Sequence, residues 1–184
     1  MILSGNEIEK AVVAGKIVID PFDPARLGPN SYDFSLGNRC KTYTSPELDA
    51  RLHNETVERE IGDDGLMISP SRLFLVNTHE RMGSTHYVPI IRGRSSTGRL
   101  GLFIDITADL IDIGSINQWT LQLHSIIPIR IYPGMVIGQV TFWVVKGEIA
   151  PYRGKYGDLR SPVGSLSHLD FSQGEDSNSA LVDG

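Results

Sequence analysis

Residues 119–145, WTLQLHSIIPIRIYPGMVIGQVTFWVV, restrict the fold more than any other part of the chain. From Trp119 to His124, apolar and polar residues alternate strictly. Because successive side chains of a β-strand point to opposite faces, this alternation predicts a strand with one apolar and one polar face. Pro128 and the Pro-Gly pair at 133–134 then interrupt the run, and these residues favour turns. We therefore predict two or three strands in this region.

The polar face of the first of these strands carries Thr120, Gln122 and His124. Such a face suits either solvent or a bound substrate, and the alternation alone leaves both open. Trp119, on the apolar face, and Trp143, near the end of the region, are predicted to lie in the core rather than to stack on a ligand.

Short apolar or alternating runs recur through the rest of the chain, with Gly, Pro and Asn between them. They occupy residues 16–20, 31–37, 73–77, 87–93 and 100–106. Many short strands separated by turns are typical of a β-barrel or a jelly-roll-like sandwich. The predicted fold class is therefore mainly β.

One short helix is predicted near the N-terminus, over residues 5–14. Ser4 and Glu7 have the spacing of a capping box, and Gly15 stands where a helix is expected to end. Residues 44–65 are polar and charged, and we expect them to form an excursion over the surface.

A length of 184 residues suits a single domain with a sizeable core. We place this domain at residues 1–160, because the regular patterning ends near Ser161. Residues 161–184 are expected to form a mobile tail unless a partner or ligand orders them.

Composition argues against several classes of protein. A nucleic-acid binder needs a basic surface, whereas this chain has a formal net charge of -5 and a pI near 5.5. The single cysteine, Cys40, excludes an intramolecular disulfide and a cysteine-rich zinc site, including that of the zinc-dependent cytidine deaminases. The sequence has no secretory signal and no apolar run of roughly 20 residues, so we predict a cytoplasmic protein that does not cross a membrane.

The turn GRSSTGRLG, residues 93–101, is the strongest local indication of a ligand. Two arginines and two serines lie close together in it: Arg94, Ser95, Ser96 and Arg99. Arginine forks and hydroxyl groups bind phosphate oxygens, and the glycines let a ligand approach the backbone closely. The turn therefore suits a polyphosphate, although a solvated loop whose arginines pair with surface acids fits the composition equally well.

Asp112 lies between two isoleucines in ADLIDIG, residues 108–114. An aspartate in this place either points into a site or begins a turn before Gly114. The local pattern favours the turn slightly.

Several motifs together resemble the dCTP deaminase family, a branch of the trimeric dUTPase superfamily. They begin with MILS at residue 1 and continue in order to about residue 156. The others are PNSYDFSLG (29–37), GRSSTGRLGL (93–102), TADLID (107–112), YPGMVIGQVTF (132–142) and PYRGKY (151–156). The resemblance implies a distorted β-barrel of the dUTPase kind, assembled as a homotrimer with active sites between subunits.

The resemblance also implies residue roles. Ala108 matches a position whose backbone meets the base and the catalytic water. Asp112 matches the aspartate beside the deoxyribose, which in dUTPases positions the water that attacks the α-phosphate. Tyr152 and Lys155 are similar to residues that close over the phosphates from a mobile tail. Magnesium is expected on the triphosphate. The implied triphosphate ligands are Arg94, Ser95, Ser96 and Arg99.

Gln122 departs from the family pattern at its most important position. The family has a glutamate there, ten residues after the aspartate, and the spacing from Asp112 to Gln122 is also ten. That glutamate is the general base and acid of metal-free deamination. An amide can bind the base and a water but cannot accept a proton at neutral pH. Losing a general base typically costs about 10²–10⁴-fold, so we predict severely impaired deamination.

Further positions depart from the family pattern or leave two interpretations open. Leu159 stands where the family tends to have a glutamine for the phosphates. Asp105 and Asp109 share parity on an extended strand, and they form either an extra metal or proton-transfer site or a solvated strand edge. His124 is either a substitute base or a hydrogen-bonded neighbour of Gln122.

The sequence thus favours Mg²⁺-dependent hydrolysis of a pyrimidine deoxynucleoside triphosphate to the monophosphate and pyrophosphate. One alternative is dCTP deamination to dUTP and ammonia, with Gln122 as an inactivating replacement. The other is a catalytically silent nucleotide-binding or regulatory protein.

Overall fold

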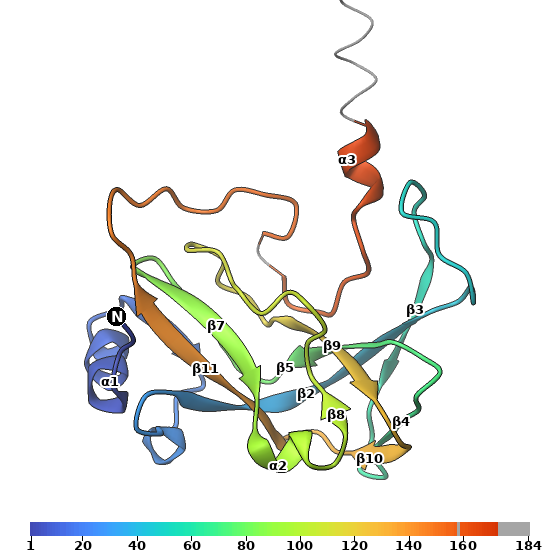
Figure 1. The fold of residues 1–184 in the computed structure, drawn as a ribbon, viewed down its shortest axis with the longest axis horizontal. Coiled ribbons are helices and arrows are strands. Elements are labelled where there is room, and N and C mark those ends of the chain that lie inside the picture. Colours follow the sequence, from blue (N-terminus) through green and yellow to red (C-terminus); the bar gives the residue numbers. More distant parts are fainter. Residues whose placement is uncertain (158, 173–184) are drawn as a thin grey trace, which may run out of the picture.

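Strands dominate the computed structural model, which describes residues 1–157 and 159–172 (Figure 1). The helices are α1 (Gly5–Val13), the 3₁₀ turn η1 (Pro24–Arg26), α2 (Ser95–Gly98) and α3 (His168–Ser172). The strands are β1 (Ile17–Asp20), β2 (Tyr32–Tyr43), β3 (Thr56–Glu60), β4 (Leu66–Ile68), β5 (Phe74–Thr78), β6 (Arg81–Ser84), β7 (Tyr87–Gly93), β8 (Leu102–Phe103), β9 (Thr120–Ser125), β10 (Ile129–Ile131) and β11 (Val136–Val144).

Six strands form a nearly closed antiparallel barrel in the order β7-β11-β2-β5-β9-β8. The chain after β8 returns to β7 and almost completes the ring. The Ile91 N–H donates to the Asp109 carbonyl at 2.8 Å, and the Ile111 N–H donates to the Pro89 carbonyl at 2.9 Å. The small pairs β1-β6 and β10-β4 lie outside this path. The predicted mainly β, barrel-like fold class is confirmed.

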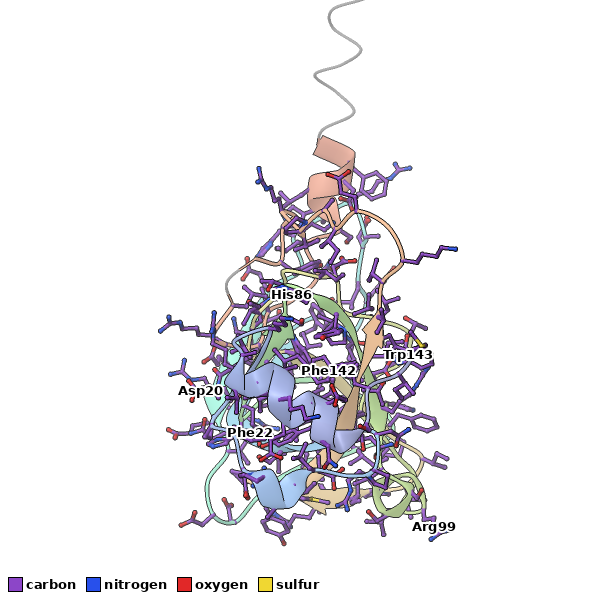
Figure 2. The ribbon with its side chains drawn as sticks, turned by 90° about the vertical axis from the view of Figure 1, so that its left-hand side faces the viewer. Asp20, Phe22, His86, Arg99, Phe142 and Trp143 are labelled. Atoms are coloured by element: carbon purple, nitrogen blue, oxygen red, sulfur yellow. The ribbon has the colours of Figure 1, made fainter. Side chains whose placement is uncertain are left out.

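The core fills the barrel with alternate side chains of these strands. Leu121 and Leu123 of β9 are fully buried, as the alternation predicts. Trp119 is also buried, but Trp143 is 40% exposed, so the prediction of a core position for Trp143 was wrong. The adjacent Phe142 fills the core position of β11, and in Figure 2 Trp143 lies nearer the edge of the molecule than Phe142.

The predicted N-terminal helix is confirmed as α1. The Ser4 hydroxyl accepts a hydrogen bond from the Glu7 N–H at 3.4 Å and caps the first turn. At the other end Gly15 adopts a φ of 69°, and the Lys16 N–H donates to the Ala11 carbonyl at 2.9 Å. This is the bonding of a Schellman ending, which needs a residue that tolerates positive φ.

The strand predictions hold for most segments and fail in two. The region 119–145 forms three strands, β9, β10 and β11. The predicted strand at 100–106 is limited to Leu102–Phe103. The expected excursion at 44–65 contains β3, which pairs with the outer half of β2. Charged side chains hide β3 from a hydrophobicity pattern, since all but its first residue are exposed.

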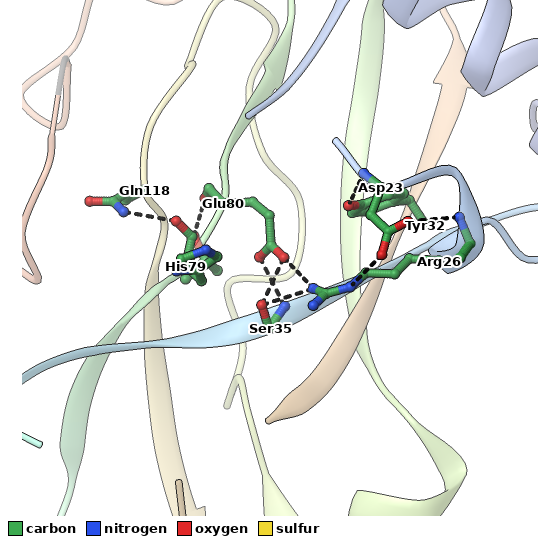
Figure 3. Close-up of polar contacts among 9 residues, drawn as sticks. Asp23, Arg26, Tyr32, Ser35, His79, Glu80 and Gln118 are labelled. Carbon is green, nitrogen blue, oxygen red and sulfur yellow. Dashed lines mark hydrogen bonds and ion pairs between the residues drawn. The ribbon is translucent and has the colours of Figure 1, made fainter. Parts of the chain in front are cut away.

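An ion pair between Arg26 and the buried Glu80 fixes the turn between β5 and β6 (Figure 3). Glu80, only 1% exposed, accepts from the Ser35 N–H at 2.9 Å and from Arg26 Nη1 at 2.6 Å. Beside it, Gln118 Nε2 donates to the His79 carbonyl at 2.9 Å. Because these bonds satisfy a buried carboxylate, they hold the β5–β6 turn against both β2 and the residues that enter β9.

The domain boundary near residue 160 stays a prediction. Residues 161–172 of the expected tail are described, and they include α3. Residues 173–184 lie outside the described residues, as does position 158. None of the helices in the described part of the chain is long and apolar enough to cross a membrane.

Candidate functional site

A cavity of about 480 Å³, which we call the central pocket, opens between the barrel and the chain that follows β11. Its walls come from β2 and β5, from the loop after β8, from β9 with its approach, and from the C-terminal residues. The lining residues are Tyr43, Leu73, Leu75, Ile91, Thr107, Ala108, Leu110, Ile111, Asp112, Ser115, Asn117, Gln118, Trp119, Thr120, Gln122, Tyr152, Tyr156, Leu159, Val163, Gly164 and Ser165.

Two of the three polar side chains on one face of β9 line this pocket. Thr120 and Gln122 line the pocket, while Leu121 between them is buried in the core. The backbone N–H of Gln122 donates to the Ile104 carbonyl at 3.0 Å, which fixes the strand. Gln122 Nε2 makes one long hydrogen bond of 3.4 Å to the Thr120 carbonyl. The amide therefore still offers its oxygen and one N–H to a ligand.

His124 lies at the third position of this face but not in the pocket lining. It pairs with Phe103 of β8, and the two ring centroids are 6.3 Å apart. His124 therefore does not line the pocket that Gln122 lines.

Asp112 lies in the loop that closes the barrel. It both begins a turn and points its side chain towards a site, the two roles that the sequence left open. The Ser115 N–H donates to the Asp112 carbonyl at 3.1 Å, so the backbone does turn there. The side chain lines the central pocket. Its carboxylate has no hydrogen bond or ion pair with any described residue. It is the only charged group in the described lining and is available to a ligand.

Gly114 positions this loop against the C-terminal chain. Its φ is +92°, and a Cβ added there would lie 2.9 Å from Pro151 Cβ. The close approach allows the Tyr152 N–H to donate to the Ile113 carbonyl at 2.7 Å. Because Tyr152 also lines the pocket, the glycine brings the C-terminal chain to the loop that carries Asp112.

Ala108 lines the pocket, but the two aspartates near it do not. Residues 104–109 form no strand, so the shared-parity argument for Asp105 and Asp109 was wrong. Asp109 forms an ion pair with Arg92. Burial raises the pKa of the Asp105 carboxyl, the charge of Asp109 raises it further, and Arg92 opposes the rise. Within the described ranges, no three His, Cys, Asp or Glu side chains gather as a metal site.

The basic turn lies at a second, separate cavity of about 260 Å³. Arg94 lines this cavity and forms an ion pair with Asp33 at 3.1 Å. Thr97, buried under the turn, donates its hydroxyl to the Arg94 carbonyl at 2.8 Å. The remaining predicted phosphate ligands are exposed at the surface, where Figure 2 shows Arg99 at the edge of the molecule. They are Ser95, Ser96 and Arg99.

The two cavities share no lining residue. One chain therefore brings Ala108, Asp112, Gln122 and Tyr152 together in the central pocket, and it holds the basic turn elsewhere. Lys155 also lies outside the pocket lining, where its Nζ is 2.5 Å from Asp170 Oδ2.

Sequence reasoning missed several polar lining residues, among them Tyr43, Asn117 and Tyr156. Asn117 lies two residues before Trp119, where the alternation begins, and an amide side chain just ahead of a predicted strand is a usable signal. Tyr43 and Tyr156 come from segments whose approach depends on tertiary packing, and no local pattern indicates them.

Comparison with known proteins decides the family. A family model described as dCTP deaminase-like matches residues 2–145. The chain belongs to the dCTP deaminase family. Among its curated relatives, the "dCTP deaminase, dUMP-forming" of Clostridium beijerinckii is 42% identical over 94% of this chain and 100% of its own length. The "dCTP deaminase" of Rhodopirellula baltica is 46% identical over 93% of this chain and 86% of its own.

A solved dCTP deaminase supports the family fold. The structure of 2'-deoxycytidine 5'-triphosphate deaminase from Agrobacterium tumefaciens superposes with a TM-score of 0.63 at 19% identity. The match covers 78% of this chain and 48% of that one. At this identity the likeness concerns the barrel fold.

Proposed function

We propose that this member of the dCTP deaminase family hydrolyses a pyrimidine deoxynucleoside triphosphate to the monophosphate and pyrophosphate, with deamination severely impaired. The observation that carries the proposal is the pairing of an unpartnered Asp112 carboxylate with the Gln122 amide in one pocket. The carboxylate suits water activation at phosphorus, and the amide does not suit proton transfer at the base.

Asp112 is proposed to orient the attacking water. A carboxylate accepts a hydrogen bond from water and directs its oxygen to the α-phosphorus. The new bond forms between the water oxygen and this phosphorus, and the bond to the bridging oxygen breaks. Pyrophosphate leaves with that oxygen, and the water proton passes to solvent through the carboxylate. Because Asp112 has no competing partner among the described residues, it is free for this role.

Gln122 is proposed to recognise the base. Its free oxygen and N–H form an adjacent acceptor and donor, which match the 3,4 edge of a pyrimidine. The amide can turn over to present the two groups in either order, so both cytosine and uracil fit. It cannot relay the protons that replacement of an amino group by water requires. The pocket volume of about 480 Å³ is in the range of small-molecule sites.

The triphosphate needs cationic groups that the described lining of the central pocket lacks, since Asp112 is its one charged member. We propose that the turn with Arg94 and Arg99 from another copy of the chain supplies them within a homotrimer. Arginine forks bind phosphate oxygens in bidentate fashion, and Ser95 and Ser96 add hydroxyl donors. Tyr152 and Lys155 approach from the C-terminal side. Mg²⁺ enters on the triphosphate and neutralises its charge.

The relatives favour a second candidate, dCTP deamination followed by hydrolysis to dUMP. Two of them, each named "dCTP deaminase, dUMP-forming", are 42% identical over 94% of this chain. In this case another group would have to carry the protons that Gln122 cannot. His124, which the sequence offers as a substitute base, lies beside Phe103 outside the pocket lining.

The test is incubation of the purified protein with each deoxynucleoside triphosphate and Mg²⁺, followed by measurement of pyrophosphate and ammonia in the same sample. Pyrophosphate without ammonia supports the proposal. Ammonia from dCTP supports the second candidate instead. Nucleotide binding without either product would leave only a binding role for the protein.

A further inference from the structure

Arg94 and Asp33 form an ion pair that bridges one strand of the barrel. Arg94 follows the last residue of β7, Asp33 lies on β2, and β11 runs between these two strands. Neighbouring strands are about 4.8 Å apart, so the pair joins residues that lie roughly two strand spacings from each other. Arg94 Nη2 is 3.1 Å from Asp33 Oδ2, and the long arginine side chain therefore reaches back across β11.

The backbone of Arg94 is fixed as well as its side chain. Its carbonyl accepts from the Gly98 N–H at 2.9 Å and from the Thr97 hydroxyl at 2.8 Å. Thr97 is buried, and its hydroxyl also lies 3.2 Å from the Ile137 carbonyl of β11. The main chain of Arg94 is thus held against β11, and the ion pair with Asp33 sets the direction of the guanidinium.

The second arginine of the basic turn, Arg99, lacks such a partner. It is exposed, and it forms no ion pair with any residue in the described part of the chain. A free arginine side chain loses rotamer freedom when it binds a ligand, and this loss weakens binding. Arg94 has already lost part of this freedom to its ion pair. Of the two arginines, Arg94 is therefore the preorganised one.

The ion pair leaves Arg94 able to bind a ligand. A guanidinium has five N–H donors. Within residues 1–157 and 159–172, Asp33 is the only partner of the Arg94 side chain. Arg94 also belongs to the lining of the cavity of about 260 Å³, whereas Asp33 lies outside this lining. The carboxylate thus holds the guanidinium from outside the cavity and leaves the cavity side of the arginine to a phosphate.

We infer that Asp33 is the positioning residue of the basic turn, and that its carboxylate holds the Arg94 guanidinium in the orientation that binds the triphosphate. The inference rests on the proposed function, in which this turn of one copy serves the central pocket of another. Asp33 acts through Arg94 and contacts no substrate itself. A side chain that is ordered before binding loses less entropy on binding, so the ion pair raises the affinity for the triphosphate.

A carboxylate near phosphates can also repel them, and this effect has the opposite sign. Asp33→Asn keeps the size of the side chain and an acceptor oxygen, but it loses the charge that holds the guanidinium. If Asp33 positions Arg94, the variant binds the triphosphate more weakly, whereas simple repulsion predicts tighter binding. We expect the affinity to fall roughly 2–10-fold and KM to rise by a similar factor, with kcat changed less.

A double-mutant cycle tests this role. Binding of the non-hydrolysable α,β-imido-dUTP with Mg²⁺ is measured by calorimetry on the full chain, for the wild type, Asp33→Asn, Arg94→Ala and the double variant. Because Asp33 acts through Arg94, Asp33→Asn should weaken binding in the wild type and weaken it no further in Arg94→Ala. Equal weakening in both backgrounds would show a merely structural carboxylate and overturn the inference. Unchanged or tighter binding in Asp33→Asn alone would also overturn it.

Glu7→Gln is the matched control for the loss of charge. It removes a carboxylate from the ion pair with Lys10 on α1, outside the linings of both cavities, and should bind the nucleotide like the wild type. If Asp33→Asn does not fold, Asp33→Glu takes its place in the cycle, because it keeps the charge and displaces the carboxylate by one methylene group.

The cycle separates the inference from the proposed function, because calorimetry needs no turnover. Nucleotide that binds as expected in all four proteins but is not hydrolysed by the wild type would contradict the proposed function alone. Weaker binding in Arg94→Ala without weaker binding in Asp33→Asn would overturn the inference alone. Unchanged binding in Arg94→Ala would remove the basic turn from triphosphate binding and overturn both.

Discussion

Lys155 Nζ lies 2.5 Å from Asp170 Oδ2 on α3, so the lysine that resembles a phosphate ligand is held by a carboxylate of its own chain. The lysine side chain is 27% exposed and the aspartate side chain 67% exposed. A triphosphate that recruits Lys155 must therefore replace Asp170 as its partner. An ion pair as exposed as this one contributes little stability, so such an exchange is feasible.

Asp170→Asn should release Lys155 for the substrate. Exposed ion pairs contribute about 0.2–1 kcal/mol, which corresponds to a fall in KM of up to about fivefold. Steady-state kinetics at low and high salt would measure it. Asp63→Asn is the matched control, because Asp63 is exposed and forms no ion pair with the described residues. An unchanged KM in Asp170→Asn would show that Lys155 does not meet the phosphates.

Asp112→Asn should abolish pyrophosphate release while nucleotide binding persists. The amide keeps the size of the carboxylate but orients water poorly and accepts no proton, so a loss of about 10²–10⁴-fold in kcat is expected. Binding of α,β-imido-dUTP by calorimetry provides the control for an intact pocket. Wild-type turnover in this variant would remove Asp112 from the mechanism.

Gly114→Ala should destabilise the site loop and weaken activity. The residue has a φ of +92°, and the new Cβ would meet Pro151 at 2.9 Å. Positive φ costs an L-residue roughly 1–2 kcal/mol, and the contact adds to this cost. Gly134→Ala separates the two effects, because Gly134 has a φ of +75° with nothing near its missing Cβ. Equal losses of unfolding free energy and activity in both variants would show that the Pro151 contact does not matter.

Asp105→Asn should raise stability at neutral pH and leave it nearly unchanged in acid. Burial, aided by Asp109, raises the pKa of the Asp105 carboxyl in the folded protein. The folded state then holds the proton more tightly than the unfolded state, so stability falls as pH rises through this interval. Asparagine stays neutral and removes the loss. Thermal unfolding at pH 3 and pH 7 measures it, and an equal Tm change at both values would contradict the account.

The local patterns that predict well here are those that depend on neighbouring residues. Ser4 and Gly15 mark both ends of α1, because caps act within a few residues. The alternation in 119–124 places Leu121 and Leu123 in the core and Thr120 and Gln122 at the pocket, because the strand period is fixed.

The features that the sequence does not predict depend on contacts with segments far away along the chain. β3 is a strand because the outer half of β2 offers it an edge, and its exposed charges conceal it. Phe142 and Trp143 are neighbours on one strand, so only one of them can face the core. The size of the two side chains does not indicate which one is buried. Asn117 and Tyr43 become site residues only when the C-terminal chain crosses the pocket.

We propose that the amide of Gln122 separates hydrolysis from deamination, and one paired measurement tests this directly. Wild-type protein and Gln122→Glu are given dCTP and Mg²⁺, and the molar ratio of ammonia to pyrophosphate is followed in each. We expect the wild type to release pyrophosphate with essentially no ammonia, and Gln122→Glu to gain ammonia release, because a carboxylate at this position can relay protons. Ammonia released by the wild type at the rate of Gln122→Glu would contradict it.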